Sequence, residues 1–360
     1  MPKGIFLVLT KHTQRLVDTT PAWGHRWDPL ESPKLPTVPP FQQTHCCDSS
    51  SHNSIGLVQH IIVHALARHA SRALSMDNAS ACLVAAPPSG TCEAWDSLCP
   101  PQLPLVVADV ADVDDFHAPL CKTLWQTSGC AASASRSRTY RLVSSPPVLI
   151  RRRLIQCPMI TVPWPSHARS PDAALHPRAR DVHVAFAGGV TGHILASRMG
   201  FENNRRRLRD ACHALRDRTL CTAIYQSLSG GAARSAVALY ARSTFCLQPP
   251  GDTIVRSGIV DALSVGCIPV LFHRAQAALW PEHWRASDSS VLYDWPRGVQ
   301  VQPDNATRVL RELMAVPRAR IRALQVGVAD AARRTFYRGR IGPTGQPDAV
   351  DVLSDVLVRL

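Results

Sequence analysis

Residues 245–272, FCLQPPGDTIVRSGIVDALSVGCIPVLF, hold two apolar runs that are separated by a proline-rich turn and an amphipathic segment. The apolar runs at 244–249 and 268–272 are short and continuous, which is typical of buried parallel strands. Residues 253–266 between them have helical spacing and end at a glycine. A strand, a helix and a strand in this order predict one unit of a parallel α/β sheet.

The same alternation continues through the C-terminal half of the chain. It predicts strands at 182–189 and 290–295, helices at 203–217 and 235–243, and more than one helix from about 304 to 335. Before residue 170 the pattern is weaker, with short strands expected at 81–87 and 103–110 and an amphipathic helix at 56–74. The fold class is therefore α/β, built on parallel sheets.

Composition divides the chain. Residues 1–55 are rich in Pro, His, Ser and Thr, and we expect them to be poorly ordered. A divergent α/β domain is expected over 56–170 and a second one over 180–345, because the segment at 167–181 is polar and punctuated by prolines. The C-terminal helix, 346–360, is expected to pack back onto the rest of the chain.

The charge of the chain favours anionic partners but not nucleic acid. There are 40 Lys and Arg against 27 Asp and Glu, which gives a formal net charge of +13. The sequence has none of the standard nucleic-acid-binding motifs, so we expect no nucleic-acid partner. No apolar run reaches 18 residues, so no transmembrane segment is expected, and the apolar run at 5–9 is too short for a signal peptide.

The 12 cysteines leave two interpretations open. None forms a C-x-x-C pair, which argues against a zinc ribbon or a thioredoxin-type motif. An even number is compatible with disulfides in an oxidising compartment, whereas several cysteines could instead be small buried apolar residues. Cys246 and Cys267 fit the second interpretation because both lie in apolar runs. Sequons at Asn78 and Asn305 mildly favour a secretory route.

The turn that follows the strand at 244–249 carries the candidate site. Ligands bind open α/β sheets at the carboxyl ends of the strands, where loops meet helix N-termini. We expect Gly251 to turn the loop, Asp252 or Thr253 to cap the helix, and Arg256 near its first turn to bind a diphosphate. Asp261 lies close to an apolar face and could accept two hydrogen bonds from a ribose diol. The alternative is a capped helix with a solvated Arg–Asp face.

Residues 245–272 strongly resemble the central motif of exostosin-like glycosyltransferases of family 47. That motif runs Phe-Cys-Leu-x-Pro-x-Gly-Asp, an arginine region, an acidic residue and Gly-Cys-Ile-Pro-Val. Further segments resemble the family in the same order, namely MITVPWPS (159–166), HVAFAGG (183–189) and RRRLRDAC (205–212). The resemblance covers roughly 56–340 and is strong from 182 to 285.

This resemblance implies a GT-B architecture, in which two Rossmann-like domains face a cleft. The nucleotide sugar, a UDP-sugar, would bind the C-terminal domain, and the glycan or polysaccharide acceptor would bind the N-terminal one. Transfer would be inverting, and no metal or other cofactor would be required. The implied location is the Golgi apparatus, with association with its membrane or with a partner glycosyltransferase left open.

The resemblance also assigns residues to the donor site. Arg256 would hold the diphosphate, and Asp261 occupies the acidic position expected to contact the ribose. Gly188 and Gly189 would let the donor approach the backbone. Arg205, Arg206 or Arg207 could add a second phosphate contact, and the alternative is that these arginines form a solvated basic face. Many family members have a double arginine near the helix start, whereas this chain has Arg256 followed by serine.

The catalytic base cannot be placed by a motif, because the N-terminal half is divergent. His117, Asp114 and Asp115 have suitable chemistry for a general base. Asp112 and Asp114 also form an Asp-x-Asp pair, which GT-A enzymes use to hold Mn²⁺, although such pairs are usually solvated loops. The divergence keeps a second function open, in which the chain is an inactive GT-B-like protein that binds a glycan or a partner.

Overall fold

The computed structural model describes part of the chain. The described residues are 4–8, 62, 66, 72–73, 76–85, 99, 102–108, 139–143, 159–168, 170–171, 174, 179–189, 202–225, 230–251, 254–295, 303–337 and 347–360. Contacts divide them into two units. The first unit contains the residues up to Val162 together with Tyr337–Leu360, and the second is Pro163–Phe336.

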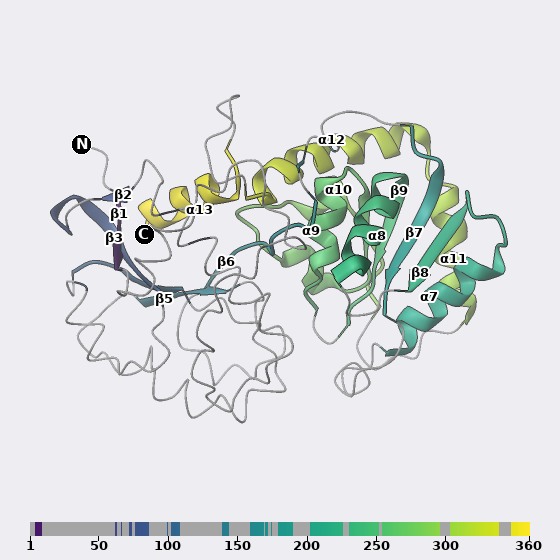
Figure 1. Ribbon diagram of the computed structural model, residues 1–360, viewed down its shortest axis with the longest axis horizontal. Helices are drawn as coiled ribbons and strands as arrows, with labels where there is room; N and C mark the ends of the chain where they lie inside the picture. Colours follow the sequence, from purple (N-terminus) through teal and green to yellow (C-terminus); the bar gives the residue numbers. More distant parts are fainter. Residues whose placement is uncertain are drawn as a thin grey trace. The chain divides into compact units, whose positions relative to one another are not determined.

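The first unit contains a parallel sheet of six strands, in the order β2-β1-β3-β4-β5-β6 (Figure 1). The strands are β1 (Gly4–Val8), β2 (Arg72–Ala73), β3 (Ala79–Ala85), β4 (Leu105–Ala108), β5 (Thr139–Val143) and β6 (Met159–Thr161). Helix α13 (Ala349–Val358) contacts β1 and β3, and its N-terminus is closed by a capping box between Asp348 and Asp351.

Strand β1 corrects the expectation that residues 1–55 are poorly ordered throughout. It lies inside the sheet, between β2 and β3, with Leu7 opposite Leu83 and with Ile5 buried. A continuous apolar run can pair on both edges in a parallel sheet, which explains why this short segment forms a strand. The predicted helix 56–74 lies mostly outside the described residues, although its last part, Arg72–Ala73, forms β2.

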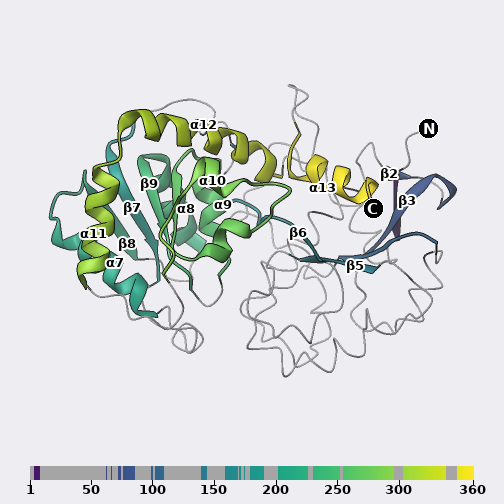
Figure 2. The same cartoon turned by 180° about the vertical axis from the view of Figure 1, so that it is seen from behind.

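The second unit contains a parallel sheet of five strands, in the order β11-β10-β9-β7-β8. The strands are β7 (Val182–Gly188), β8 (Cys221–Tyr225), β9 (Ser243–Gln248), β10 (Ile268–Leu271) and β11 (Val291–Leu292). The helices are α7 (Glu202–Ala214), α8 (Gly230–Ala241), α9 (Ser257–Ser264), α10 (Ala286–Ser289), α11 (Pro303–Met314) and α12 (Arg318–Thr335), with a 3-10 helix, η2, at Arg274–Ala278. Helix α11 packs against α7 (Figure 2).

Both faces of this second sheet are buried. Alternate residues of β7 belong to different clusters, since Val184 and Phe186 pack with Leu208 of α7, whereas Ala185 and Ala187 pack with side chains of α8. Burial on both faces explains why the strands read as continuous apolar runs. Two parallel sheets with helices confirm the α/β class with two Rossmann-like halves.

The division between the units lies at Pro163 rather than at the predicted 167–181. Ser166 and His167 both bond to Asp261, so the chain already belongs to the second unit at this point. The segment expected to be a polar linker is also anchored at its end by Arg180. Its guanidinium donates to the carbonyls of Ser243 (2.7 Å) and Val265 (3.0 Å), and so joins the start of β9 to the end of α9.

Three disulfides are formed among the described cysteines: Cys82–Cys99, Cys212–Cys221 and Cys246–Cys267. The third corrects the expectation that Cys246 and Cys267 are merely small apolar residues. Both cysteines are buried among apolar residues, as expected. They lie on or next to the neighbouring strands β9 and β10, however, and a disulfide joins them. Burial alone could not distinguish a paired cysteine from a free one.

Candidate functional site

The predicted donor-site residues lie along the carboxyl edge of the second sheet. Strand β7 ends at Gly188 and β9 ends at Gln248, and both strands run parallel. The chain then turns through Gly251 and begins α9 at Ser257. In parallel sheets this edge, where strand ends meet helix N-termini, is where ligands bind.

Helix α9 begins four residues later than expected. We predicted a helix from 253, capped by Asp252 or Thr253, but the N-cap is Arg256, whose backbone is extended and whose side chain makes no capping bond. Residues 252 and 253 lie outside the described part of the chain. Ile254 and Val255 are buried, and the carbonyl of Ile254 accepts a hydrogen bond from Gln276 Nε2 (3.2 Å), which holds this segment out of the helix.

Gln276 positions the loop, and the sequence contained no signal for it. Its side chain is fully buried. Its Oε1 accepts from the backbone N–H of Phe272 (2.8 Å), and its Nε2 donates to the carbonyl of Gln248 (2.9 Å) as well as to that of Ile254. One amide therefore connects the end of β9, the residue after β10 and the segment that leads into α9.

The structure brings Arg205, Arg256 and three of the predicted glycines together. A Cβ on Gly251 would overlap the guanidinium groups of both Arg205 and Arg256. A Cβ on Gly188 would lie 3.7 Å from Arg256 Nη2. Arg205 Nη1 donates to the carbonyl of Gly189 (3.3 Å). Two guanidinium groups thus converge over a glycine at the edge of the sheet, beside the N-terminus of α9.

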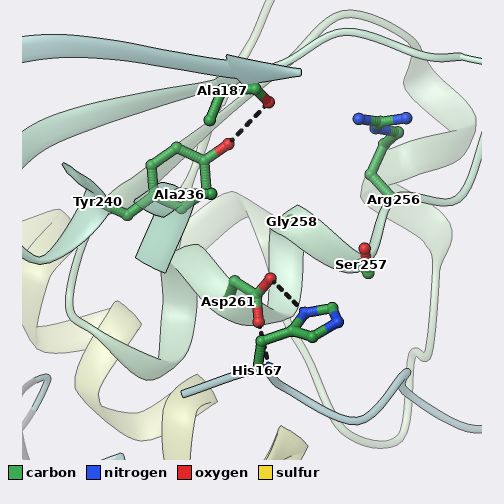
Figure 3. A pocket seen from close by; sticks show the side chains of 8 residues that line it. All are labelled: His167, Ala187, Ala236, Tyr240, Arg256, Ser257, Gly258 and Asp261. Atoms are coloured by element: carbon green, nitrogen blue, oxygen red, sulfur yellow. Dashed lines mark hydrogen bonds and ion pairs between the residues drawn. The ribbon is translucent and has the colours of Figure 1, made fainter. Parts of the chain in front are cut away.

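A pocket lies at the N-terminus of α9, and Arg256 is among the residues that line it (Figure 3). It is lined by His167, Ala187, Ala236, Tyr240, Arg256, Ser257, Gly258 and Asp261. The backbone N–H groups of the first turn of an α-helix have no partners within the helix and favour an anion, as does Arg256. The pocket therefore combines a cation and a helix N-terminus, which suits a phosphate.

Asp261 has a different set of partners from the one expected. Its carboxylate is buried, with 5% of the side chain exposed. Oδ1 accepts from Ser166 Oγ (3.0 Å) and from the backbone N–H of His167 (2.6 Å), and Oδ2 lies 2.9 Å from His167 Nδ1. Both oxygens are thus engaged within the protein. The ribose contact stays a prediction, while the observed role of Asp261 is to hold His167.

The protonation states in the pocket follow from these contacts. Burial lowers the pKa of His167, but the charge of Asp261 and its hydrogen bond outweigh burial, so the net pKa is raised. Burial is also the main reason why the pKa of Tyr240 is raised, so its hydroxyl stays protonated and donates to the carbonyl of Ala187 (3.4 Å). Asp261 therefore shifts the imidazole of His167 towards its protonated form, while the phenol of Tyr240 stays neutral.

Sequence analysis missed several lining residues, above all His167, Tyr240, Ser257 and Gly258. His167 lies in the segment predicted to be a linker, and the one sequence feature that points to it is its place directly after the MITVPWPS motif. Gly258 packs against Gln248, since a Cβ on it would lie 2.7 Å from Gln248 Oε1. Tyr240 lies in α8, a helix predicted from its apolar spacing alone.

Several other sequence predictions lie outside the described residues. They are the phosphate-loop residue Asp252, the base candidates His117, Asp114 and Asp115, and the pair Asp112 and Asp114. Within the described part of the chain, no cluster of three or more His, Cys, Asp or Glu side chains could hold a metal ion. The described helices include none with the length and hydropathy that a membrane span requires.

Comparison with known proteins places the chain in a family. Relatives include the probable xyloglucan galactosyltransferase GT19 of Arabidopsis thaliana, which is 32% identical over 127 residues, 33% of this chain and 28% of the relative. Another is the xyloglucan galactosyltransferase MUR3 of Arabidopsis thaliana, 28% identical over 123 residues, 33% of this chain and 19% of the relative. The chain thus matches less than a third of the length of either.

A solved structure, that of the glycotransferase of kitacinnamycin, gives a TM-score of 0.40 at 13% identity, with 100% of this chain and 99% of that chain covered. The exostosin GT47 domain model matches residues 123–315, which is more than half of the chain. This chain therefore belongs to the exostosin GT47 family.

Proposed function

We propose that this chain is a glycosyltransferase that binds a UDP-sugar at the edge of its second sheet and transfers the sugar, with inversion, to a polysaccharide. The observation that carries the proposal is the convergence of Arg205 and Arg256 over Gly251, beside the N-terminus of α9. Family membership supports the reaction class. The inactive, glycan-binding alternative is kept as an outcome of the test below.

The chemistry requires a stabilised leaving group. An acceptor hydroxyl attacks the anomeric carbon, its proton passes to a general base, and the bond from that carbon to the diphosphate oxygen breaks with its electron pair. The nucleoside diphosphate leaves with an additional negative charge. Two guanidinium groups and a helix N-terminus are suited to that charge, because each is already oriented before the reaction. No metal is required for this role.

The donor and acceptor are proposed from the relatives. The two relatives described above are named a probable xyloglucan galactosyltransferase and a xyloglucan galactosyltransferase, and another relative is the xyloglucan-specific galacturonosyltransferase 1 of Arabidopsis thaliana. We therefore propose UDP-galactose as the first donor to test and UDP-galacturonate as the second, with xyloglucan as the acceptor. A galacturonate donor adds a carboxylate, which the basic character of the chain would tolerate.

The proposed location is the Golgi lumen. Three disulfides among the described cysteines support an oxidising compartment. The sequon residue Asn78 is exposed, at the amino end of β3, which leaves it accessible to glycosylation. Association with the Golgi membrane or with a partner glycosyltransferase is part of the same proposal.

Calorimetry with UDP tests the donor site. We expect Arg256→Ala to weaken UDP binding about tenfold or more, because a charge-assisted hydrogen bond of roughly 1.5–3 kcal/mol is lost. Arg242→Ala is the matched control, since Arg242 is an exposed arginine at the opposite edge of the same sheet, paired with Asp181. Equal UDP affinity in wild type and a folded Arg256→Ala variant would overturn the proposal.

Turnover separates the active enzyme from the inactive alternative. Wild type is incubated with UDP-galactose or UDP-galacturonate and xyloglucan oligosaccharides, and UDP release is followed together with the mass of the product. Release of UDP that depends on the acceptor supports the proposal that the chain is an active glycosyltransferase. Tight UDP binding without turnover on any acceptor favours a binding protein.

A further inference from the structure

His167 is held in one orientation at the wall of the pocket. Its backbone N–H and its Nδ1 are both bonded to the Asp261 carboxylate, at 2.6 Å and 2.9 Å. Ser166 Oγ donates to the same carboxylate and accepts from the backbone N–H of Ala168 (3.0 Å), so the segment itself is tied down. Since Nδ1 is used by Asp261, Nε2 is the ring nitrogen on the side away from that carboxylate (Figure 3).

We propose that His167 is a donor-binding residue, whose Nε2–H donates a hydrogen bond to the diphosphate of the nucleotide sugar beside Arg256. The inference rests on the proposed function, since it assigns a further residue to the same site. His167 and Arg256 line one pocket but come from segments about 90 residues apart. The resemblance to the family assigned Gly188, Gly189, Arg205, Arg256 and Asp261 to the donor site and did not include this histidine.

The Asp261 carboxylate makes the imidazole suitable for this task. It is buried, it carries the charge opposite to that of an imidazolium, and it fixes the ring before a ligand arrives. A ring that is already oriented loses little conformational entropy on binding. Asp261 therefore acts as a positioning residue, and His167 is the group that touches the donor.

The described lining residues of the pocket include three other charged or titratable groups. Among the described lining residues these groups are Asp261 and Arg256, at α9, and Tyr240, on α8. Tyr240 stays neutral, and Asp261 supplies the compensating charge. A bound diphosphate would place further negative charge beside the imidazole and raise the pKa of His167 further. Donor binding should therefore take up protons at pH values where free His167 is partly neutral.

A base role for His167 is the competing interpretation. A neutral imidazole with Nδ1–H bonded to Asp261 could accept a proton at Nε2 from an acceptor hydroxyl. That role would leave donor binding independent of His167 and of its protonation. The two roles therefore separate in a binding experiment that contains no acceptor.

Calorimetry with UDP-galactose and with uridine tests the proposal. Because the diphosphate of UDP-galactose is esterified to the sugar, it does not titrate near neutral pH. Any pH dependence of the binding affinity therefore comes from the protein. We expect His167→Gln to weaken UDP-galactose binding about tenfold at one pH unit below the ordinary imidazole value of about 6.5, and to leave uridine binding unchanged. His213→Gln is the matched control, because His213 is an exposed histidine of α7.

The wild-type protein supplies a second measurement that needs no variant. Titrations in buffers of different ionisation enthalpy should show proton uptake on UDP-galactose binding, and the affinity should fall as the pH rises through the raised pKa of His167. Both effects should be absent from His167→Gln. Proton uptake without any effect of the substitution would overturn the assignment to His167.

The outcomes separate this proposal from the proposed function. If wild type binds UDP-galactose, Arg256→Ala loses binding and a folded His167→Gln binds normally at every pH, the histidine proposal is wrong and the donor site stands. If His167→Gln binds normally but loses turnover, the base role replaces the proposal. If the folded wild type binds no nucleotide sugar, both proposals fail.

Discussion

Nδ1 of His167 lies 2.9 Å from Oδ2 of Asp261, although 94 residues separate the two in the sequence. The bond connects the segment that enters the second unit to helix α9, whose N-terminus borders the candidate pocket. The same carboxylate also accepts from Ser166. Asp261 therefore contributes to the stability of the second unit and to the orientation of the imidazole.

Asp261→Asn separates these two contributions. An asparagine can still accept hydrogen bonds through Oδ1, but it carries no charge to balance an imidazolium. We expect the pKa of His167 to fall, because burial would remain while the charge of Asp261 would be gone. We expect a loss of about 2 kcal/mol in the free energy of unfolding, from weaker bonds in a buried network. The checks are an NMR titration of the His167 ring and urea unfolding, and an unchanged pKa would contradict this account of the pair.

Much of the second unit could be predicted from the sequence. Its strands are buried on both faces of the sheet, so each strand is a continuous apolar run in the sequence. The strand expected at 182–189 is β7 at Val182–Gly188, and the helix expected at 203–217 is α7 at Glu202–Ala214. The helices expected from about 304 to 335 are α11 at Pro303–Met314 and α12 at Arg318–Thr335, and Pro317 is the N-cap of the second. The start of α9 was missed because Gln276, a distant side chain, holds Ile254 out of the helix.

The candidate site was predictable only where its residues are close in sequence. Gly251, Arg256 and Asp261 stand in one motif, and the structure places all three around the same turn and helix. The pairing of His167 with Asp261 could not be predicted, because no local pattern encodes a contact across 94 residues. The pairing of Cys246 with Cys267 was missed for a related reason, since a buried cysteine looks apolar in sequence whether or not it is bonded.

The stability of the second unit should depend on pH through His167. The folded-state pKa of His167 is raised, so the contribution of its bond to Asp261 is fully present below the unfolded-state pKa of about 6.5 and is lost as the pH rises through the folded-state pKa. We expect the difference in unfolding free energy between wild type and His167→Gln to be larger at pH 6 than at pH 8.5. Urea unfolding at both pH values measures it. A difference that stays constant or grows with pH would count against the pair.

Gly251→Ala should affect donor binding more than stability. The added methyl would overlap the guanidinium groups of Arg205 and Arg256, which are the ends of flexible side chains and can move aside. We expect the fold to be kept, with a change in unfolding free energy below about 1 kcal/mol, and UDP affinity to fall about tenfold as the two cations separate. Thermal melting and calorimetry provide the two readings. Unchanged UDP affinity would show that the two guanidinium groups do not act together on the nucleotide.

Gly327→Ala should destabilise the second unit, contrary to helix propensity. Glycine in the middle of a helix is worse than alanine by about 1 kcal/mol, so propensity alone predicts stabilisation. In α12, however, a Cβ on Gly327 would overlap the backbone carbonyl of Asp288, which cannot rotate away as a side chain could. We expect a net loss of about 1–3 kcal/mol, the usual cost of overpacking. Val326→Ala is the control, because Val326 is the neighbouring residue and is 74% exposed, and its change should stay within about 0.5 kcal/mol.

Removal of the Cys246–Cys267 disulfide should cost more stability than removal of Cys212–Cys221. The first closes a loop of sequence separation 21, which contains the proposed donor turn and α9, whereas the second closes one of 9. Loop-closure entropy predicts about 3.3 kcal/mol for the longer loop and about 2.6 kcal/mol for the shorter one. Paired alanine substitutions at each bridge, compared by urea unfolding after mass spectrometry has counted the free thiols, measure both. An equal or greater loss at Cys212–Cys221 would mean that native packing, rather than restriction of the unfolded chain, sets the contribution of these bridges.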